Sequence, residues 1–277
     1  MPSISHSQLE TWGQCPRRYR LSRIDRVPQA PSDNLIFGDA IHQAIEMDGK
    51  RLMDGKPGLS VTALAGVFEA ALEYRAAKDD PTGLLTGTLP DLRLRALATL
   101  RAYVERVQPH YHPVAVELPF TLPIPNLDDW QFTGRIDAIT ERDGKTTIVD
   151  LKTASKPWAR DIEHTKEQAT AYQWASGLAL PRVTFIVFPT VATAEGYTCP
   201  VEYRPTVRSS AHITAYIEHV RNTVGRIEEA KRSNVFPASV GPLCAWCSVV
   251  SSCEEGQAYL ARTGRKIAVP ALPVTAR

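Results

Sequence analysis

The sequence predicts an α/β domain in which a small sheet is flanked by helices and preceded by a helical N-terminal part. Apolar residues recur at helical spacing in residues 36–53, 60–78 and 91–108, follow strand patterns in residues 113–122, 130–141 and 145–152, and return to helical spacing in residues 209–232. Asp143-Gly144, between two strand-like stretches, is a strong signal for a β-hairpin. Helices, then a small sheet, then a helix and further strands are typical of one α/β domain with an N-terminal helical elaboration.

The composition is that of an ordered globular protein. The chain has 277 residues, of which 43% are apolar and 22% are charged, so it is long enough to bury a sizeable core. No apolar run approaches the roughly 18–20 residues that span a bilayer, and the polar N-terminus is unlike a signal peptide. We therefore expect a cytoplasmic protein without a membrane partner. The formal net charge of +2 neither requires nor excludes a nucleic-acid partner.

The first predicted helix runs from Ser5 toward Cys15. Ser5 and Gln8 have the spacing of a capping box, which favours a helix start at this point. The following residues 15–26 contain five arginines and one aspartate, a local net charge of +4. This segment is either a solvated helix face or, because Tyr19 lies among the arginines, a surface that stacks on bases and binds phosphates.

The later elements are predicted from the spacing of apolar residues and from turn residues between them. The predicted helices cover residues 36–53, 60–78, 91–108, 162–178 and 209–232. A Gly- and Pro-containing loop is predicted over residues 79–90. The predicted strands cover residues 113–122, 130–141, 145–152, 182–189 and 198–204. The tail from residue 233 is expected to be loop-like, and it contains three of the five cysteines.

Two aspartates and a lysine lie at the predicted hairpin. Asp137 lies inside the strand before the turn and Asp150 near the end of the strand after it, so antiparallel pairing brings both carboxylates to one edge of the sheet. Asp150 and Lys152 are two residues apart and point to the same face. Carboxylates that face one site bind Mg²⁺ or Mn²⁺, and a lysine beside them serves phosphodiester hydrolysis. The alternative is an exposed ion pair, although charges at the end of an apolar strand are costly without a partner.

Four motifs in the chain resemble, in the same order, those of the PD-(D/E)XK nuclease superfamily, specifically its RecB-like exonuclease branch. Gly38-Asp-Ala-Ile-His42 resembles the GxxxH motif, and Gly134-Arg-Ile-Asp137 resembles the first metal-binding aspartate, here preceded by Ile136 in place of proline. Asp150-Leu-Lys152 resembles the D-x-K element, and Gln168-Ala-Thr-Ala-Tyr172 resembles the QxxxY motif on the next helix. The resemblance implies a restriction-endonuclease-like core, a small mixed sheet flanked by helices.

The resemblance also implies the metal ligands and the water-activating residue. His42, Asp137, Asp150 and the Leu151 carbonyl would hold the metal ion. Lys152 would position or activate the attacking water. Without the resemblance, a histidine on an apolar helix face is more often a core residue than a ligand.

Three further features lie near these motifs. Gln168 and Tyr172, one helical turn apart, would contact the DNA backbone or support Lys152. Glu117, on the strand before the hairpin, is either an acid that supports the site or an ordinary surface carboxylate. Gly144-Lys145-Thr146 lacks the upstream glycine and the following helix of a phosphate-binding loop, so we expect no ATPase activity.

Four of the five cysteines have a spacing that suits metal binding. Cys244, Cys247 and Cys253 form a C-x₂-C-x₅-C pattern, and Cys15 is the fourth candidate, while Cys199 is expected to be a bystander. Four thiolates bind either a 4Fe–4S cluster or zinc, but zinc sites usually contain two C-x₂-C pairs, which favours iron. The pattern is similar to that of iron–sulfur RecB-like nucleases of the AddB and CRISPR-associated types, which share a CPRRY-like start. Such a cluster would link the N-terminal helix to the C-terminal tail.

These features predict one RecB-like nuclease domain over residues 1–277. Its expected parts are an N-terminal helical part (1–112), a catalytic sheet and helix (113–205), and a C-terminal helix with a cluster-binding tail (206–277). The expected activity is a Mg²⁺- or Mn²⁺-dependent DNA exonuclease with a 4Fe–4S cluster. The resemblance places it in recombination, repair, phage DNA processing or CRISPR adaptation, with a protein partner from such a process.

Arg17, Arg18 and Tyr19 are the expected DNA contacts. One short basic segment favours single-stranded or frayed DNA ends over tracking along a duplex. Two alternatives remain: a non-catalytic DNA-end-binding partner with the same fold, and a zinc-stabilised structural protein. The second alternative explains the cysteines but not His42, Asp137, Asp150 and Lys152.

Overall fold

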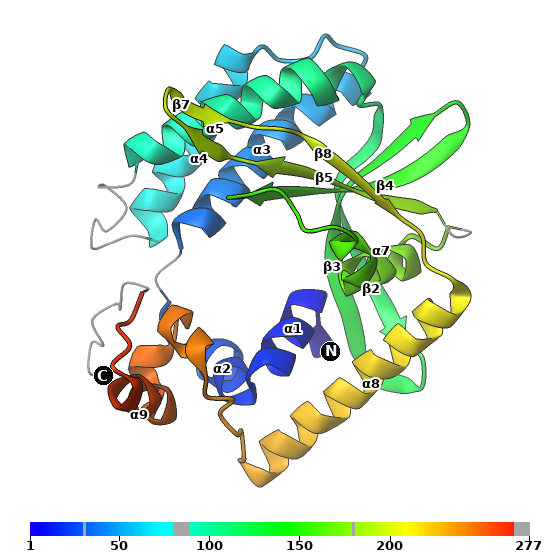
Figure 1. Ribbon diagram of the computed structural model, residues 1–277. Helices are drawn as coiled ribbons and strands as arrows, with labels where there is room; N and C mark the ends of the chain where they lie inside the picture. The colour runs from blue at the N-terminus through cyan, green and yellow to red at the C-terminus, as the bar shows by residue number, and fades with distance from the viewer. Residues whose placement is uncertain (30–31, 80–88, 179–180, 269–277) are drawn as a thin grey trace.

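A mixed sheet forms the centre of the structure, a computed structural model that describes residues 1–29, 32–79, 89–178 and 181–268 (Figure 1). Within these residues, six strands pair in the order β1-β3-β4-β5-β8, with β2 also paired to β3. The strands of this sheet are β1 (Ser3–Ile4), β2 (Pro113–Ile124), β3 (Leu127–Arg142), β4 (Lys145–Ala154), β5 (Arg182–Pro189) and β8 (Glu202–Thr206). A separate hairpin consists of β6 (Val191–Thr193) and β7 (Gly196–Thr198).

Helices lie on both faces of the sheet. They are α1 (His6–Gln14), α2 (Pro16–Tyr19), α3 (Asp33–Met53), α4 (Val61–Asp79), α5 (Leu89–Ala102), α6 (Ile162–Thr165), α7 (Glu167–Ser176), α8 (Ser210–Ser233) and α9 (Glu254–Thr263). Single π-helical turns follow α2 and α5, at Arg20–Ile24 and Tyr103–Val107. None of the helices in the described part of the chain has the length and apolar character needed to cross a membrane.

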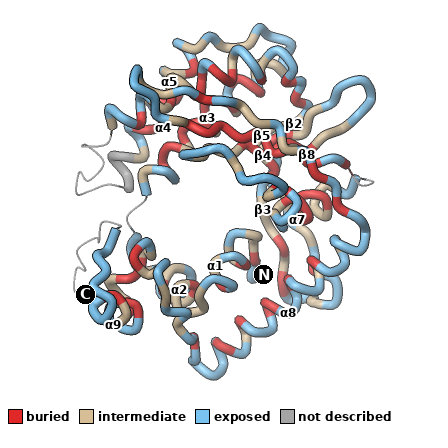
Figure 2. The backbone as a smooth tube through the Cα atoms, in the orientation of Figure 1, coloured by how far each residue is buried: buried red, intermediate tan, exposed pale blue. Residues whose placement is uncertain are grey.

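Alternating residues of the central strands pack on the two helical layers. Val149 and Leu151 of β4 lie in the core formed with α3, α4 and α5. Ile148 of the same strand lies in a second core with Ala169 and Tyr172 of α7. Because side chains alternate along a strand, Asp150 and Lys152 lie on the same face of β4 as Ile148 and face α7. The buried residues gather in these strands and in the facing helices (Figure 2).

Strands β1 and β4 share one edge of β3. Strand β2 covers the other edge of β3 along most of its length. On the shared edge, β1 pairs in parallel with Gln131 and Phe132, whereas β4 pairs antiparallel with β3 only as far as Ala138 and Val149. Beyond Val149, β4 continues beside β5 to the end of both strands. The sheet therefore opens between β3 and β4 at Asp137 and Asp150.

The elements that follow α8 lie away from the sheet (Figure 1). In Figure 1, the elements form an open ring, in which α8 leads from the sheet to the cysteine-containing segment and α9 lies near α2. The two ends of the chain are joined by direct contacts, because Arg17 N–H donates to the Pro237 carbonyl and the Arg17 guanidinium binds Glu255 at 2.6 Å.

Most predicted elements are present within a few residues, and the α/β class is confirmed. The capping box at Ser5 and Gln8 is formed as predicted. The predicted helix 162–178 is wrong as one element, because the extended backbone of Lys166 separates α6 from α7. The loop-like tail is also wrong in part, because Cys253 caps the ten-residue helix α9. The predicted loop 79–90 lies mostly outside the described residues, and the predicted strand 198–204 is replaced by the end of β7 and by β8.

Gly134 allows β2 and β3 to pack closely. A Cβ atom at this position would lie 2.4 Å from Cζ of Phe120, whose ring stacks on Phe132. We predict that Gly134→Ala lowers the free energy of unfolding by about 1–3 kcal/mol, as overpacking does in other cores. Urea denaturation measures this change. Gly13→Ala is the control: a Cβ there meets no atom within 4 Å, so this helical substitution should stabilise by about 0.5–1 kcal/mol. A Gly134→Ala midpoint equal to that of the parent would contradict the proposed clash.

Candidate active site

Asp137 occupies the opening between β3 and β4. Its Oδ2 accepts a hydrogen bond of 2.8 Å from the backbone N–H of Leu151, at the point where the two strands no longer pair. The hydrogen bond satisfies a backbone donor that would otherwise lack its partner in the sheet. Asp137 is thus fixed at the beginning of the opening, with its carboxylate turned toward β4.

His42 of α3 lies over the same opening. Its Nε2 lies 3.0 Å from the Leu151 carbonyl oxygen, which only accepts, so Nε2 carries the hydrogen. Its Nδ1 lies 3.7 Å from Asp137 Oδ2 and 3.9 Å from Glu117 Oε1, distances too long for hydrogen bonds. Gly38, one turn earlier, permits the close approach of α3, since a Cβ atom there would lie 3.2 Å from Thr153 Oγ1.

Glu117 joins this group from β2. One ligand atom from each of His42, Glu117 and Asp137 lies within 4.8 Å of the others, which is a spacing that suits a metal ion. Glu117 has a positive φ of 47°, an uncommon conformation for this residue type within a strand, and it binds Arg135 at 3.0 Å. Sequence reasoning left its role open, because only the register of β2 against β3 places it beside Asp137.

Asp150 and Lys152 form the adjoining part of the site. The fully buried Asp150 places Oδ2 2.6 Å from Lys152 Nζ, as an ion pair without hydrogen-bond geometry. Its Oδ1 accepts a 3.0 Å hydrogen bond from Tyr172, whose hydroxyl in turn accepts one of 2.7 Å from Gln168 Nε2. The structure therefore brings Gln168 and Tyr172 to Asp150, which they orient from α7.

The pKa values of these groups follow from burial and from their neighbours. Burial and the Asp150 carboxylate raise the pKa of Asp137 to about 6. Burial lowers the pKa of His42, but Glu117 and Asp137 outweigh it and raise this pKa above its ordinary value. Burial likewise opposes the charged form of Lys152, but Asp150 and Asp137 raise its pKa overall. Lys152 is therefore an ammonium group at neutral pH and a poor proton acceptor.

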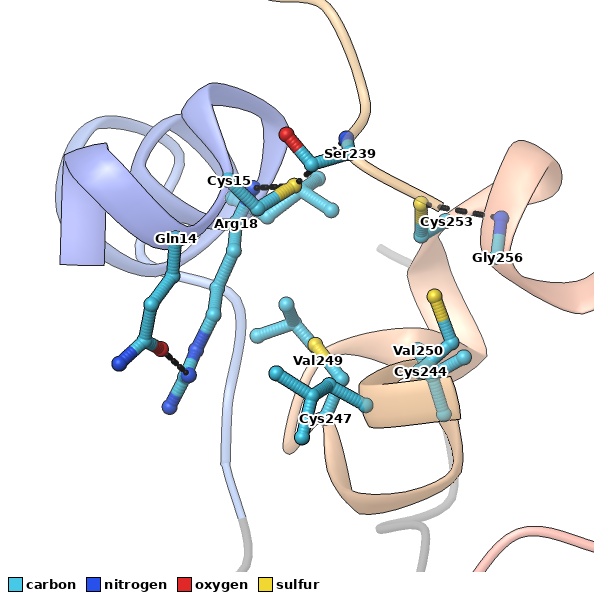
Figure 3. Close-up of a pocket in the computed structure, with 12 residues that line it drawn as sticks. Gln14, Cys15, Arg18, Ser239, Cys244, Cys247, Val249, Val250, Cys253 and Gly256 are labelled. Carbon is cyan, nitrogen blue, oxygen red and sulfur yellow. Dashed lines mark hydrogen bonds between the residues drawn. The ribbon is translucent and has the colours of Figure 1, made fainter. Parts of the chain in front are cut away.

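Four cysteines surround one cavity of about 70 Å³, as Figure 3 shows. Cys15 comes from the junction of α1 and α2, and the other three, Cys244, Cys247 and Cys253, come from the segment before α9. Backbone N–H groups point at the sulfurs: Arg18 and Ser239 donate to Cys15 Sγ at 3.4 Å, and Gly256 donates to Cys253 Sγ at 3.4 Å. Burial raises the pKa values of the Cys247 and Cys253 thiols. Cys199 lies elsewhere, buried beside α5.

The expected DNA contacts near the N-terminus are placed differently from the prediction. Tyr19 is 4% exposed and packs edge-on against Trp12, so its ring offers no free face for stacking, and that prediction is wrong for this residue. Arg17 binds Glu255, and Arg18 binds Gln14 beside the cysteine cavity. Contacts of Arg17 and Arg18 with DNA stay a prediction.

An α/β fold whose sheet opens beside carboxylates, a histidine and a lysine defines a nuclease with a restriction-endonuclease-like core. Residues 3–254 match the family described as "PD-(D/E)XK nuclease superfamily". The chain therefore belongs to the PD-(D/E)XK nuclease superfamily, and the predicted fold class is confirmed. No curated protein matches the chain significantly in sequence.

Solved structures of the same fold are distant in sequence. A crystal structure from Eubacterium rectale, described as a "Putative exonuclease", is similar with a TM-score of 0.51 and 13% identity, over 91% of this chain and 88% of that chain. The crystal structure of SSO0001 is similar with a TM-score of 0.39 and 15% identity, over 92% and 86%. The first supports the fold alone.

The raised pKa of Asp137 predicts that its charge destabilises the metal-free protein. The folded carboxyl holds its proton up to about pH 6, against an ordinary value of 3.8, so the free energy of unfolding falls as pH rises through this window. Asp137→Asn keeps an acceptor for Leu151 N–H without the charge. With a chelator present, we expect it to be more stable than the parent by about 3 kcal/mol at pH 8 and equal to it below pH 4.

Urea denaturation at several pH values tests this. Asp143→Asn, in the exposed hairpin turn, is the control and should show no such dependence. Equal stability of Asp137→Asn and the parent at pH 8 would show that the charge of Asp137 does not destabilise the metal-free protein.

Proposed function

We propose that the protein is a metal-dependent DNA exonuclease whose catalytic centre is the opening between β3 and β4. The observation that carries this proposal is the convergence of His42, Glu117 and Asp137 at the point where Asp150 and Lys152 also lie. The membership of the superfamily supports a nuclease, and the exonuclease activity is proposed by analogy with the E. rectale protein of the same fold, which is described as a putative exonuclease.

The donor set suits Mg²⁺ or Mn²⁺. Carboxylate and carbonyl oxygens are the preferred ligands of these ions, and manganese also accepts imidazole. The buried Asp150 Oδ2 accepts no hydrogen bond, and His42 Nδ1 faces two carboxylates without a bond to either. We propose His42, Asp137, Asp150 and the Leu151 carbonyl as ligands, and we add Glu117 to this set. When bound, the ion would supply Lewis acidity toward a phosphate oxygen and its attacking water.

The chain's own residues would hold and orient the reactants. Lys152, as an ammonium, donates hydrogen bonds to a phosphate oxygen or to the attacking water, and its raised pKa disfavours a role as general base. Tyr172, whose pKa burial raises well above its ordinary value, stays a hydroxyl and fixes the Asp150 carboxylate. Gln168 fixes Tyr172 in turn, so both act as positioning residues.

The charged residues around the site suit a substrate that makes few phosphate contacts. The site opens into a cavity of about 630 Å³, which His42, Glu117 and Asp137 line together with Arg75, Arg135, Asp39 and Glu46. Such a mixed-charge entrance suits the end of a single or frayed strand better than a long duplex, which needs many phosphate contacts. A role in recombination, repair, phage DNA processing or CRISPR adaptation, in the cytoplasm and with a protein partner, follows from the resemblance to RecB-like nucleases.

The cysteine cavity supports a 4Fe–4S cluster over zinc. The structure describes all four thiols, and no three Sγ atoms lie within 4.8 Å of one another. A single tetrahedral zinc ion, with Zn–S distances of about 2.3 Å, would bring the sulfurs to about 3.8 Å. Wider spacing suits a cluster in which each thiolate binds a different iron. We propose that this cluster fixes α1 and α2 to the C-terminal segment.

The nuclease proposal predicts cleavage of end-labelled linear single-stranded DNA in the presence of Mg²⁺ or Mn²⁺. Asp150→Asn and Lys152→Gln should each lower the rate by about a hundredfold or more, as the loss of one positioned electrostatic group does. Lys145→Gln, an exposed change on the same strand, should leave the rate unchanged. A covalently closed circle of the same sequence should not be cleaved, because it has no end. Cleavage of the circle at the linear rate would indicate an endonuclease, and full activity of either site variant would disprove the assignment.

The cluster proposal predicts a brown protein when it is purified without oxygen, with about four irons per chain. Cys247→Ser should bleach the protein and lower its melting temperature, because the link between the chain ends is lost. Cys199→Ser, outside the cavity, should keep both colour and iron. A colourless protein that contains stoichiometric zinc would show that the cysteine cavity binds zinc and not a 4Fe–4S cluster.

A further inference from the structure

A second group of metal-ligating side chains lies between β4 and α7, on and beside the short helix α6. Asp161, Glu163 and His164 each place one ligand atom within 4.8 Å of the others. His164 Nε2 lies 3.8 Å from Glu163 Oε1. None of the three belongs to the candidate active site, and the function proposed above assigns them no role.

Glu163 is a buried carboxylate that lacks a hydrogen bond on one oxygen. Its side chain is 9% exposed, and Oε2 accepts no hydrogen bond within the described residues. The neighbouring Arg204 reaches Oε2 only at 4.0 Å, because its guanidinium donates at 3.0 Å to Glu202. A buried carboxylate oxygen that has only this long ion pair and no hydrogen bond is costly, and a cation bound closer to it would offset that cost.

His164 is oriented so that one ring nitrogen faces the carboxylates. Its Nδ1 lies 3.0 Å from the hydroxyl of the buried Thr206, which leaves Nε2 on the side of Glu163. An outer hydrogen bond of this kind is typical of metal-binding histidines, since it fixes the ring. The exposed Asp161 carboxylate makes no hydrogen bond or ion pair with another described side chain, so it is available as a third ligand.

We propose that Asp161, Glu163 and His164 bind a divalent transition-metal ion of the zinc class. Zinc binds imidazole nitrogen together with carboxylate oxygen, whereas Mg²⁺ prefers oxygen ligands and retains several waters. Three protein ligands leave one tetrahedral position for water. This site is separate from the proposed catalytic ion and from the cysteine cavity.

The position of the site indicates what the ion does. Residues 155–166 connect the strand that carries Asp150 and Lys152 to the helix that carries Gln168 and Tyr172. Arg208 already holds this connection by donating hydrogen bonds to the carbonyls of Glu163 and Lys166. A metal ion here would fix the same connection from its solvent side, and with it the placement of α7.

Cobalt, which replaces zinc and is visible spectroscopically, tests the proposal in the full chain as purified. The background variant Asp137→Asn/Glu117→Gln removes the other ligand cluster, and bands from thiolate-bound cobalt identify any ion in the cysteine cavity. We expect one equivalent of Co²⁺ with ligand-field bands and without thiolate charge-transfer bands. His164→Ala and Asp161→Asn should each weaken this binding at least tenfold. Both residues are exposed, and asparagine suits the left-handed backbone at 161 (φ 61°), so both variants should fold.

His110→Ala, which removes an exposed histidine elsewhere, is the matched control and should bind Co²⁺ like the background variant. Absence of thiolate-free cobalt binding in the background variant would overturn the proposal and leave Arg204 as the partner of Glu163. Binding by His164→Ala or Asp161→Asn with the background affinity would overturn it as well. Either result leaves the nuclease proposal untouched, because that proposal is tested by DNA cleavage.

Discussion

The hydrogen bond between the Leu151 N–H and the Asp137 carboxylate is the interaction on which the candidate active site depends. Strand β4 leaves β3 after Val149, and a backbone donor at the edge of a separating sheet needs a new partner. A carboxylate fills that role and at the same time remains directed into the opening. One side chain thus ends the strand pairing and supplies the first acidic group, so the site exists because the sheet divides at this residue.

The second constraint is the burial of charge beside an apolar strand. Asp150 is fully buried, and its cost is offset by Lys152 on one oxygen and by Tyr172 on the other. Helix α7 therefore has two functions in the fold: its apolar residues cover the sheet, and its polar turn orients a carboxylate. His42, Lys152 and Arg135 lie beside the three carboxyl groups of Glu117, Asp137 and Asp150, yet burial and Asp150 still raise the pKa of Asp137. Carboxyl groups held this close destabilise the metal-free protein, and a bound cation would offset that repulsion.

The sequence predicted the parts of the protein that depend on local pattern. The order of helices and strands, the hairpin at Asp143-Gly144 and the closeness of Asp137 to Asp150 follow from residue periodicity and turn chemistry, and the structure agrees. It did not predict the two-residue strand β1, which is too short to have a period. It left the role of Glu117 open, because the register of β2 on β3 places this residue. It wrongly predicted an exposed Tyr19 ring, because residues distant in sequence form the core that buries this ring. The helix α9 was missed since its start depends on a cysteine as the capping residue.

The contacts of Arg17 with Pro237 and Glu255 have a consequence for biosynthesis. The N-terminal segment leaves the ribosome first, but its partners are synthesised more than two hundred residues later. Until then, Arg17 lacks both contacts, although β1 and α1 can already pair and pack with β3, and bringing α2 to the C-terminal segment requires closure of most of the chain, which is entropically slow. The sheet with α3–α5 can therefore assemble during translation, whereas the junction of the two ends forms only after it. Chains truncated before Pro237 would lack both partners of Arg17 and with them the junction of α2 with the C-terminal segment.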